Sequence, residues 1–197
     1  RGFVVAADHV LPLRAEARLE DERRLVLGQR QPRGDVHGAR VWDPGAEERV
    51  GGGELVVCRD ERPPATPITL IVIHGISMPP GEFGGDAIAR LFTNTLDPAA
   101  HRAFAGVAAL RVSSHFLIRR DGTLVQFVPC SQRAWHAGVS AWRGRERCND
   151  FSIGIELEGT DDIPYGAPQY TTLARLTKAL RRRYPIADIA GHSEVAP

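Results

Sequence analysis

Residues 68–74, ITLIVIH, place the strongest constraint on how this chain can fold. They form a continuous apolar run that is rich in β-branched residues and ends on His74. A strand with one face in water alternates apolar and polar residues, so an unbroken run predicts a central strand that is covered on both faces. A loop rich in Pro and Gly follows the histidine, and at such strand ends α/β sheets present side chains to a ligand.

Helical and strand-like segments alternate after this run. Residues 87–96, AIARLFTNTL, space their apolar side chains for one face of a helix. Residues 170–185 predict a second amphipathic helix that stops at Pro185, because proline cannot continue a helix. Between them, two strand-like runs flank Asp121-Gly122, a dipeptide that tolerates the positive φ angles of a tight hairpin.

Residues 151–159, FSIGIELEG, alternate with a period of two. The alternation puts Ile153, Ile155 and Leu157 on one face of a strand, and Gly154, Glu156 and Glu158 on the other. A last short strand, ADIAGH, ends at His192. Strands and helices that are interspersed, with one hairpin among them, predict an α/β fold with a mixed central β-sheet flanked by helices.

The first part of the chain has a different character. Residues 1–57 combine a charge-dense helical candidate, RAEARLEDERRL, with turn-like and glycine-rich segments. We expect these residues to be a poorly ordered or accessory extension, and residues 58–197 to form the folded domain. Because the sequence starts at Arg1, either end of the domain could be incomplete.

Composition excludes several classes of protein. A formal net charge of +1 gives no global attraction to nucleic acid or to an anionic membrane, so we expect neither as a partner. The three cysteines are odd in number and lack CxxC spacing, which favours a reducing compartment over a disulfide framework. No apolar run approaches the roughly 20 residues of a membrane helix, and no export signal precedes the domain. We therefore expect a cytoplasmic protein.

Two histidines share the same context. His74 and His192 each follow a short apolar stretch, and both imidazoles can meet above one edge of the sheet. Catalytic zinc sites use about three His or carboxylate ligands and keep one position for water, and Glu156 lies on a polar strand face where it can serve as a general base. The alternative for either histidine is a hydrogen bond to the backbone of a loop.

Several long motifs occur in a familiar order between Cys58 and Pro197. They are VIHGISMPPGEFGG, LFTNTLDP, RVSSHFLIRRDGTLVQFVP, RAWHAGVSAWRGRERCNDFSIGIELEGTDDIPY and GHSEVAP. On these motifs the chain resembles the zinc-dependent N-acetylmuramoyl-L-alanine amidases of the amidase type-2 family, in particular the AmpD-like enzymes of cell-wall recycling. The resemblance implies the α/β fold that this family shares with peptidoglycan-recognition proteins.

The resemblance also implies roles for individual residues. Matched position by position, His74 and His192 are zinc ligands and Glu156 is the catalytic carboxylate. Glu158 does not occupy the matching place and is expected to be solvated or to bind a loop. We expect His115, within SSHFLI, to be a structural histidine with satisfied hydrogen bonds.

Four further residues lie in motifs that line the substrate groove of the family. They are Arg111, Trp135, His136 and Arg147. Trp135 can stack on sugar or peptide or pack in the core, and Arg147 can clamp a substrate carboxylate or be a surface cation. Asn149-Asp150 is sufficiently explained as a turn into the strand of Glu156.

The sequence departs from the family in two places. Gly75 stands where the recycling enzymes often have asparagine, which removes a possible contact to the sugar. The third zinc ligand of the family, an aspartate, and a lysine before it lie beyond the second histidine, where this chain ends at Pro197. We expect two imidazoles alone to bind zinc more weakly than three ligands do.

The implied activity is zinc-dependent hydrolysis of the amide between N-acetylmuramic acid, in its anhydro form, and L-alanine. Glu156 would take a proton from water and pass it to the leaving nitrogen. A binding module that recognises muramyl peptide without cutting it is the first alternative. A metallopeptidase is the second, although its HExxH motif is absent. No protein partner is inferred.

Overall fold

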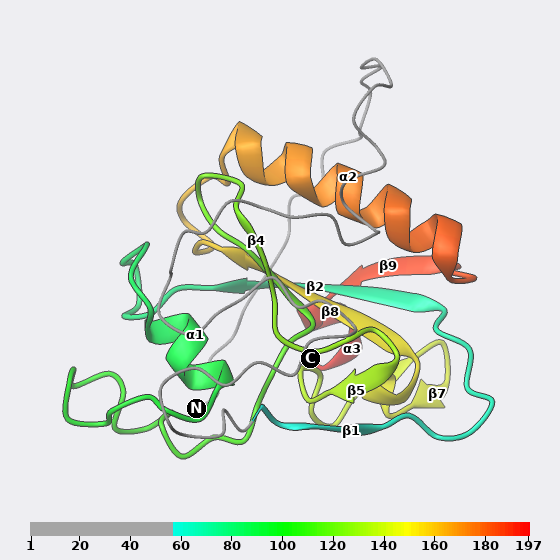
Figure 1. Cartoon of the computed structure of the whole chain (residues 1–197), viewed down its shortest axis with the longest axis horizontal. Coiled ribbons are helices and arrows are strands. Elements are labelled where there is room, and N and C mark those ends of the chain that lie inside the picture. The colour runs from blue at the N-terminus through cyan, green and yellow to red at the C-terminus, as the bar shows by residue number, and fades with distance from the viewer. Residues whose placement is uncertain (1–56) are drawn as a thin grey trace.

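A five-stranded mixed sheet forms the centre of the computed structural model, which describes residues 57–197. Its strands, in spatial order, are β4 (Leu124–Gln126), β3 (Phe116–Ile118), β8 (Ser152–Glu158), β2 (Leu70–Ile76) and β9 (Asp188–Gly191). β3, β8, β2 and β9 are parallel, and β4 is antiparallel to β3. The α/β fold with a mixed sheet is confirmed (Figure 1). The interpretation of residues 1–56 falls outside the described residues.

The apolar run occupies the position that its composition predicts. β2 lies between β8 and β9, and Leu70, Ile71 and Val72 are at most 1% exposed. The strand extends further than expected, because Ile76 still pairs with Glu158 on β8. His74 is therefore inside β2, two residues before its end, and the prediction that it directly precedes a loop is wrong.

Helices cover both faces of the sheet, as Figure 1 shows. The helix α2 (Ala167–Arg183) lies along one face, where Leu176 and Leu180 join the core cluster of β3, β8 and β2. On the opposite face α1 (Ala87–Phe92) packs beside β3 and β4. α1 ends four residues earlier than predicted, and Asn94, just after it, has a φ of 56° that no α-helix allows. None of the described helices is both long and apolar enough to span a membrane.

The predicted hairpin joins β3 to β4. Gly122 has a φ of 86°, and its N–H donates to the carbonyl of Arg119 at 2.9 Å. The Asp121 carboxylate accepts from the N–H of Thr123 at 2.8 Å, which closes the other side of the turn. The hairpin at Asp121-Gly122 is confirmed, and Gly122 alone of the two residues takes a positive φ.

Shorter elements that the sequence pattern did not reveal complete the domain. β1 (Arg59–Glu61) pairs with β5 (Gln132–Ala134), and β6 (Ala141–Trp142) pairs with β7 (Arg145–Glu146). A 3₁₀ turn, η1 (Cys148–Asp150), leads into β8. These pieces place residues 135–152 across the polar side of β8, where the candidate site lies.

Candidate active site

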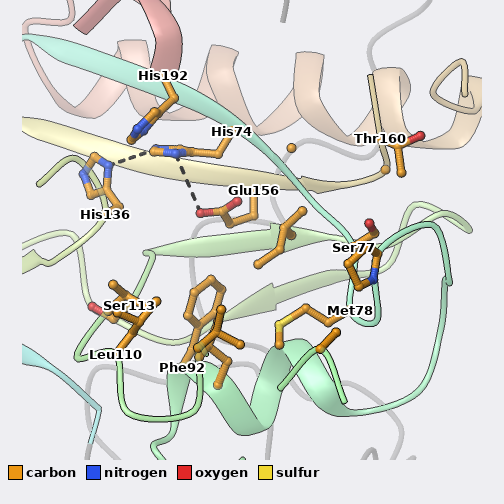
Figure 2. A pocket seen from close by; sticks show the side chains of 18 of the residues that line it. His74, Ser77, Met78, Phe92, Leu110, Ser113, His136, Glu156, Thr160 and His192 are labelled. Carbon is orange, nitrogen blue, oxygen red and sulfur yellow. Dashed lines mark hydrogen bonds and ion pairs between the residues drawn. The ribbon is translucent and has the colours of Figure 1, made fainter. Parts of the chain in front are cut away.

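Strand pairing brings His74 and Glu156 together. The two residues are direct partners in the parallel pair β2–β8, so their side chains leave the same face of the sheet. Nδ1 of His74 lies 3.9 Å from Oε1 of Glu156. Figure 2 shows both side chains at one end of a cavity.

His192 reaches the same point from the next strand. β9 pairs with β2 as far as Gly191, and His192 is the following residue, the first of α3 (His192–Val195). Its ring centroid lies 4.8 Å from that of His74 (Figure 2). The structure thus brings together the two histidines and the carboxylate that the sequence singled out.

His136 is the fourth member of this group. It follows β5, and its Nδ1 lies 3.0 Å from Nε2 of His74, with the two rings almost perpendicular at 85°. Its Nε2 lies 3.1 Å from Oγ of Ser152 at the start of β8. The two nitrogens of His136 are thus both engaged inside the protein.

Burial controls the charges of these groups. It lowers the pKa of His74 well below its usual 6.5, and the neighbouring His136 and His192 lower it further. Burial likewise lowers the pKa of His136 and of His192. It raises the pKa of Glu156 to about 8, because a carboxylate is poorly solvated there. The rings therefore present lone pairs at neutral pH, and Glu156 can hold a proton.

The donor atoms fit a zinc ion. Nδ1 of His192 is shielded from solvent and has no hydrogen-bond partner among the described residues. Neutral imidazole nitrogens are preferred zinc ligands. Within residues 57–197 no group of three or more His, Cys, Asp or Glu side chains is arranged to hold a metal ion, so the two imidazoles form a partial donor set.

The cavity has a polar end, where the histidines and Glu156 gather, and a mostly apolar wall. Its volume is about 430 Å³, and His74, Glu156 and His192 line the polar end. The wall opposite is built by the loop after β2, by α1 and by the segment after α1, through side chains that include Met78, Phe92, Phe104, Val107 and Leu110. A ligand with an apolar surface and a polar group to be attacked suits this shape.

The four residues implied for the substrate groove are placed differently from one another. Trp135 and His136 line the cavity. Trp135 is 37% exposed, so the alternative that it packs in the core is wrong. Arg111 and Arg147 are exposed and are not among the residues that line the cavity. Arg147 instead contacts Asp150, with 3.2 Å between Nε and Oδ2.

Both ring nitrogens of His115 are hydrogen-bonded inside the domain. His115 accepts from the N–H of Gly154 through Nδ1 at 3.0 Å, and its Nε2 donates to the carbonyl of Gln132 at 3.2 Å. Its structural role is confirmed. Burial and the adjacent guanidinium of Arg62 lower the pKa of His115 to about 3.

Glu158 binds a loop and is not solvated. It is 1% exposed and accepts from the N–H of Gly84 at 2.6 Å and of Arg120 at 3.1 Å. Asn149 does more than turn the chain, because its Oδ1 accepts from the N–H groups of His136 and Ala137 at 3.2 and 2.9 Å. Glu158 therefore fastens the Pro/Gly loop at one side of the cavity, and Asn149 fixes the backbone at His136.

The roles of Ser152 and Gly154 at the site were not recognised from the sequence. Both lie on the face of β8 that carries Glu156, and the alternation that identified Glu156 also puts them there. Their small side chains carried no chemical signal by themselves.

A family model described as N-acetylmuramoyl-L-alanine amidase matches residues 64–196. The 1,6-anhydro-N-acetylmuramyl-L-alanine amidase AmpD of Citrobacter freundii is 60% identical over 144 residues, which are 71% of this chain and 74% of that protein. The protein of the same name from Haemophilus influenzae is 47% identical over 155 residues, 74% of this chain and 84% of that one. The chain in a crystal structure of a selenomethionine AmpD derivative is 60% identical in sequence to this chain. The match covers 71% of this chain and 79% of the AmpD chain, and the two structures superpose with a TM-score of 0.70.

Proposed function

The chain belongs to the N-acetylmuramoyl-L-alanine amidase family, and we propose that it hydrolyses the amide between anhydro-N-acetylmuramic acid and L-alanine with the help of zinc. The relatives that carry the name 1,6-anhydro-N-acetylmuramyl-L-alanine amidase support this choice of substrate. The free thiols of Cys58, Cys130 and Cys148 suit a reducing compartment. We assign the reaction to the cytoplasm, where muramyl peptides are recycled.

One observation supports the proposal above all others. Nδ1 of His74 lies 3.9 Å from the carboxylate of Glu156, and the ring of His192 lies 4.8 Å from that of His74, at the polar end of a cavity large enough for a small ligand. Nδ1 of His192 has no hydrogen-bond partner among residues 57–197. Two neutral imidazoles beside a carboxylate of raised pKa are the parts of a metal-dependent hydrolase. We assign His74 and His192 as zinc ligands.

Zinc at these two nitrogens would supply a Lewis acid that polarises the amide carbonyl and acidifies water. Glu156 takes the proton from the attacking water and delivers it to the nitrogen of L-alanine as the amide breaks. Burial favours the neutral carboxyl group, which helps Glu156 to hold that proton between the two transfers. The cavity wall formed by Phe92, Phe104 and Leu110 excludes water on the other side of the substrate.

Trp135 and the two arginines are proposed to act on substrate at different distances. Trp135 lies at the cavity with an exposed ring and can stack on sugar or peptide. Arg111 and Arg147 are outside the cavity wall, so they can contact only a peptide that extends beyond it. No protein partner is part of the proposal.

The experiment is to follow release of L-alanyl peptide from an anhydro-muramyl peptide. We expect turnover that is lost on treatment with a chelator and restored by zinc. An ordinary peptide of the same sequence, without the sugar, should remain uncut, and cutting it would favour a metallopeptidase. A protein that binds the muramyl peptide but shows no turnover with zinc added is a binding module, and that result would contradict the proposal.

A further inference from the structure

We propose that Ser152 and His136 are positioning residues that fix the tautomer of His74, so that its Nδ1 carries a lone pair for the metal. This inference rests on the proposed zinc site. It assigns His136 a role different from the groove contact that the resemblance implies.

Ser152 sets the direction of the chain of hydrogen bonds. Its Oγ lies 2.6 Å from the carbonyl oxygen of Cys148 and 3.1 Å from Nε2 of His136. A carbonyl can only accept, so the single hydroxyl hydrogen of Ser152 is donated to Cys148. Ser152 then has only lone pairs to offer His136, and Nε2 of His136 must be the nitrogen that carries the hydrogen.

The direction passes from His136 to His74. A neutral imidazole has one N–H, so His136 with hydrogen on Nε2 has a bare Nδ1. That Nδ1 lies 3.0 Å from Nε2 of His74, which must therefore donate. His74 is left with a bare Nδ1, and this is the atom that faces Glu156 at 3.9 Å. The hydroxyl of Ser152 thus determines which nitrogen of a residue two rings away can bind zinc.

The ring of His136 is closely packed on several sides. A Cβ on Gly154 would lie 2.6 Å from Cγ of His136, so the ring lies directly against the backbone of β8. His115 stands behind it, with ring centroids 5.7 Å apart. Asn149 fixes the backbone of the same residue through its Oδ1. The ring and the backbone of His136 are thus both held by the surrounding structure.

The same contacts argue against a direct role of His136 in binding substrate. His136 is only 9% exposed, and both of its ring nitrogens already have partners inside the protein. A substrate that hydrogen-bonded to either nitrogen would have to break one of these contacts. The ring can offer the cavity only its carbon edge.

The first test is nitrogen-15 NMR of the histidine side chains in the full, metal-free chain, which distinguishes the two neutral tautomers. We expect His136 and His74 both to carry hydrogen on Nε2. Hydrogen on Nδ1 of His74 would overturn the inference. This measurement needs no variant and no turnover.

The second test removes the hydroxyl. Ser152→Ala should leave His136 free to adopt either tautomer, mix the tautomers of His74, and weaken zinc binding by about 10- to 100-fold, as measured by titration with zinc alone. Ser140→Ala is the matched control, because the Ser140 hydroxyl also contacts Cys148, by accepting from its N–H at 3.1 Å, and donates to the carbonyl of Gly138 rather than facing a histidine nitrogen. Equal zinc affinity in the two variants would overturn the inference.

The third test is rescue at His136. His136→Asn keeps an acceptor near the place of Nδ1 and should retain zinc affinity within a few-fold of the native chain. His136→Leu has a similar volume and no acceptor, and it should lose affinity by about 10- to 100-fold. An equal loss in both would indicate a merely structural ring and contradict the inference.

These results separate the inference from the proposed function. If the tautomers and zinc affinities are as expected but muramyl peptide is not cleaved, the amidase proposal is wrong and the positioning role remains. Cleavage with the opposite tautomer of His74 would do the reverse.

Discussion

The two faces of β8 come from one alternating sequence, but one face is apolar and the other is polar. On one face Ile153, Ile155 and Leu157 pack under α2 in an apolar core cluster. On the other face Ser152, Gly154, Glu156 and Glu158 are polar or small, and they are buried as well. A solvent-facing strand would also alternate in this way, so the pattern by itself does not distinguish a wet polar face from a buried one.

The difference shows what a buried polar face requires. Ser152 and Glu158 each have hydrogen-bond partners that compensate for lost water. Among the described residues, the ion-pair partner of Glu156 is Nδ1 of His74, and it is as far away as 3.9 Å. A buried carboxylate with so little compensation costs stability, and such costs are found where a group is needed for chemistry.

Glu156→Gln should give the largest effect on the polar face. We expect turnover to fall by about 10²- to 10⁴-fold, because the amide side chain cannot accept the proton of water. Zinc content should be unchanged, since both imidazoles remain. Near-normal turnover of anhydro-muramyl peptide would remove Glu156 as the base.

The buried His115 should make stability depend on pH. Its folded pKa of about 3 is below the unfolded value of 6.5, so its contribution is complete above pH 6.5 and is lost as the pH falls toward 3. Between pH 7 and pH 5 we expect a loss of about 2 kcal/mol in the free energy of unfolding from this residue. Urea unfolding of the native chain and of His115→Gln at both pH values measures it, and equal losses in the two proteins would refute it.

Removing the carboxylate that fastens the loop should have a smaller effect. Glu158→Ala leaves the N–H groups of Gly84 and Arg120 without their acceptor, and we expect a loss of about 1.5 kcal/mol in the free energy of unfolding. KM should rise because the loop carries Met78 and Pro80 of the cavity wall. Glu158→Gln keeps one acceptor oxygen and should fall between the native chain and the alanine variant; a KM equal to the native value in both would contradict this role.

The smallest effect is expected on the apolar face. Ile155→Val removes one buried methylene beside Glu156 and should lower the free energy of unfolding by about 1 kcal/mol. Turnover should not change, because the side chain points under α2, away from the cavity. A fall in kcat comparable to that of Glu156→Gln would show that the two faces are not independent.

Local sequence patterns were enough to predict the strands and the turn whose conformation depends on neighbouring residues. The apolar run of β2, the Asp121-Gly122 turn and the period of β8 depend on neighbouring residues, and each is present in the structure. The ends of elements depend on tertiary pairing. β2 includes His74 and Ile76 because β8 continues beside it, which no local pattern in residues 75–76 could reveal.

The site was only partly predictable for the same reason. Motifs shared with the amidase family identified His74, His192 and Glu156. The pairing of β2 with β8 and β9, which no motif shows, brings their side chains together. The orientation of His136 depends on Ser152 and on the absence of a Cβ at Gly154. These are contacts between segments far apart along the chain, made by residues with no distinctive chemistry.

X-ray anomalous diffraction at the zinc absorption edge, on crystals of the full chain grown with zinc, tests the central claim most directly. The account predicts one peak about 2 Å from Nδ1 of His74 and from Nδ1 of His192, on the side of Glu156. A peak bound through Nε2 of His74, a peak on His136 in place of either ligand, or a zinc position elsewhere in the domain would contradict it.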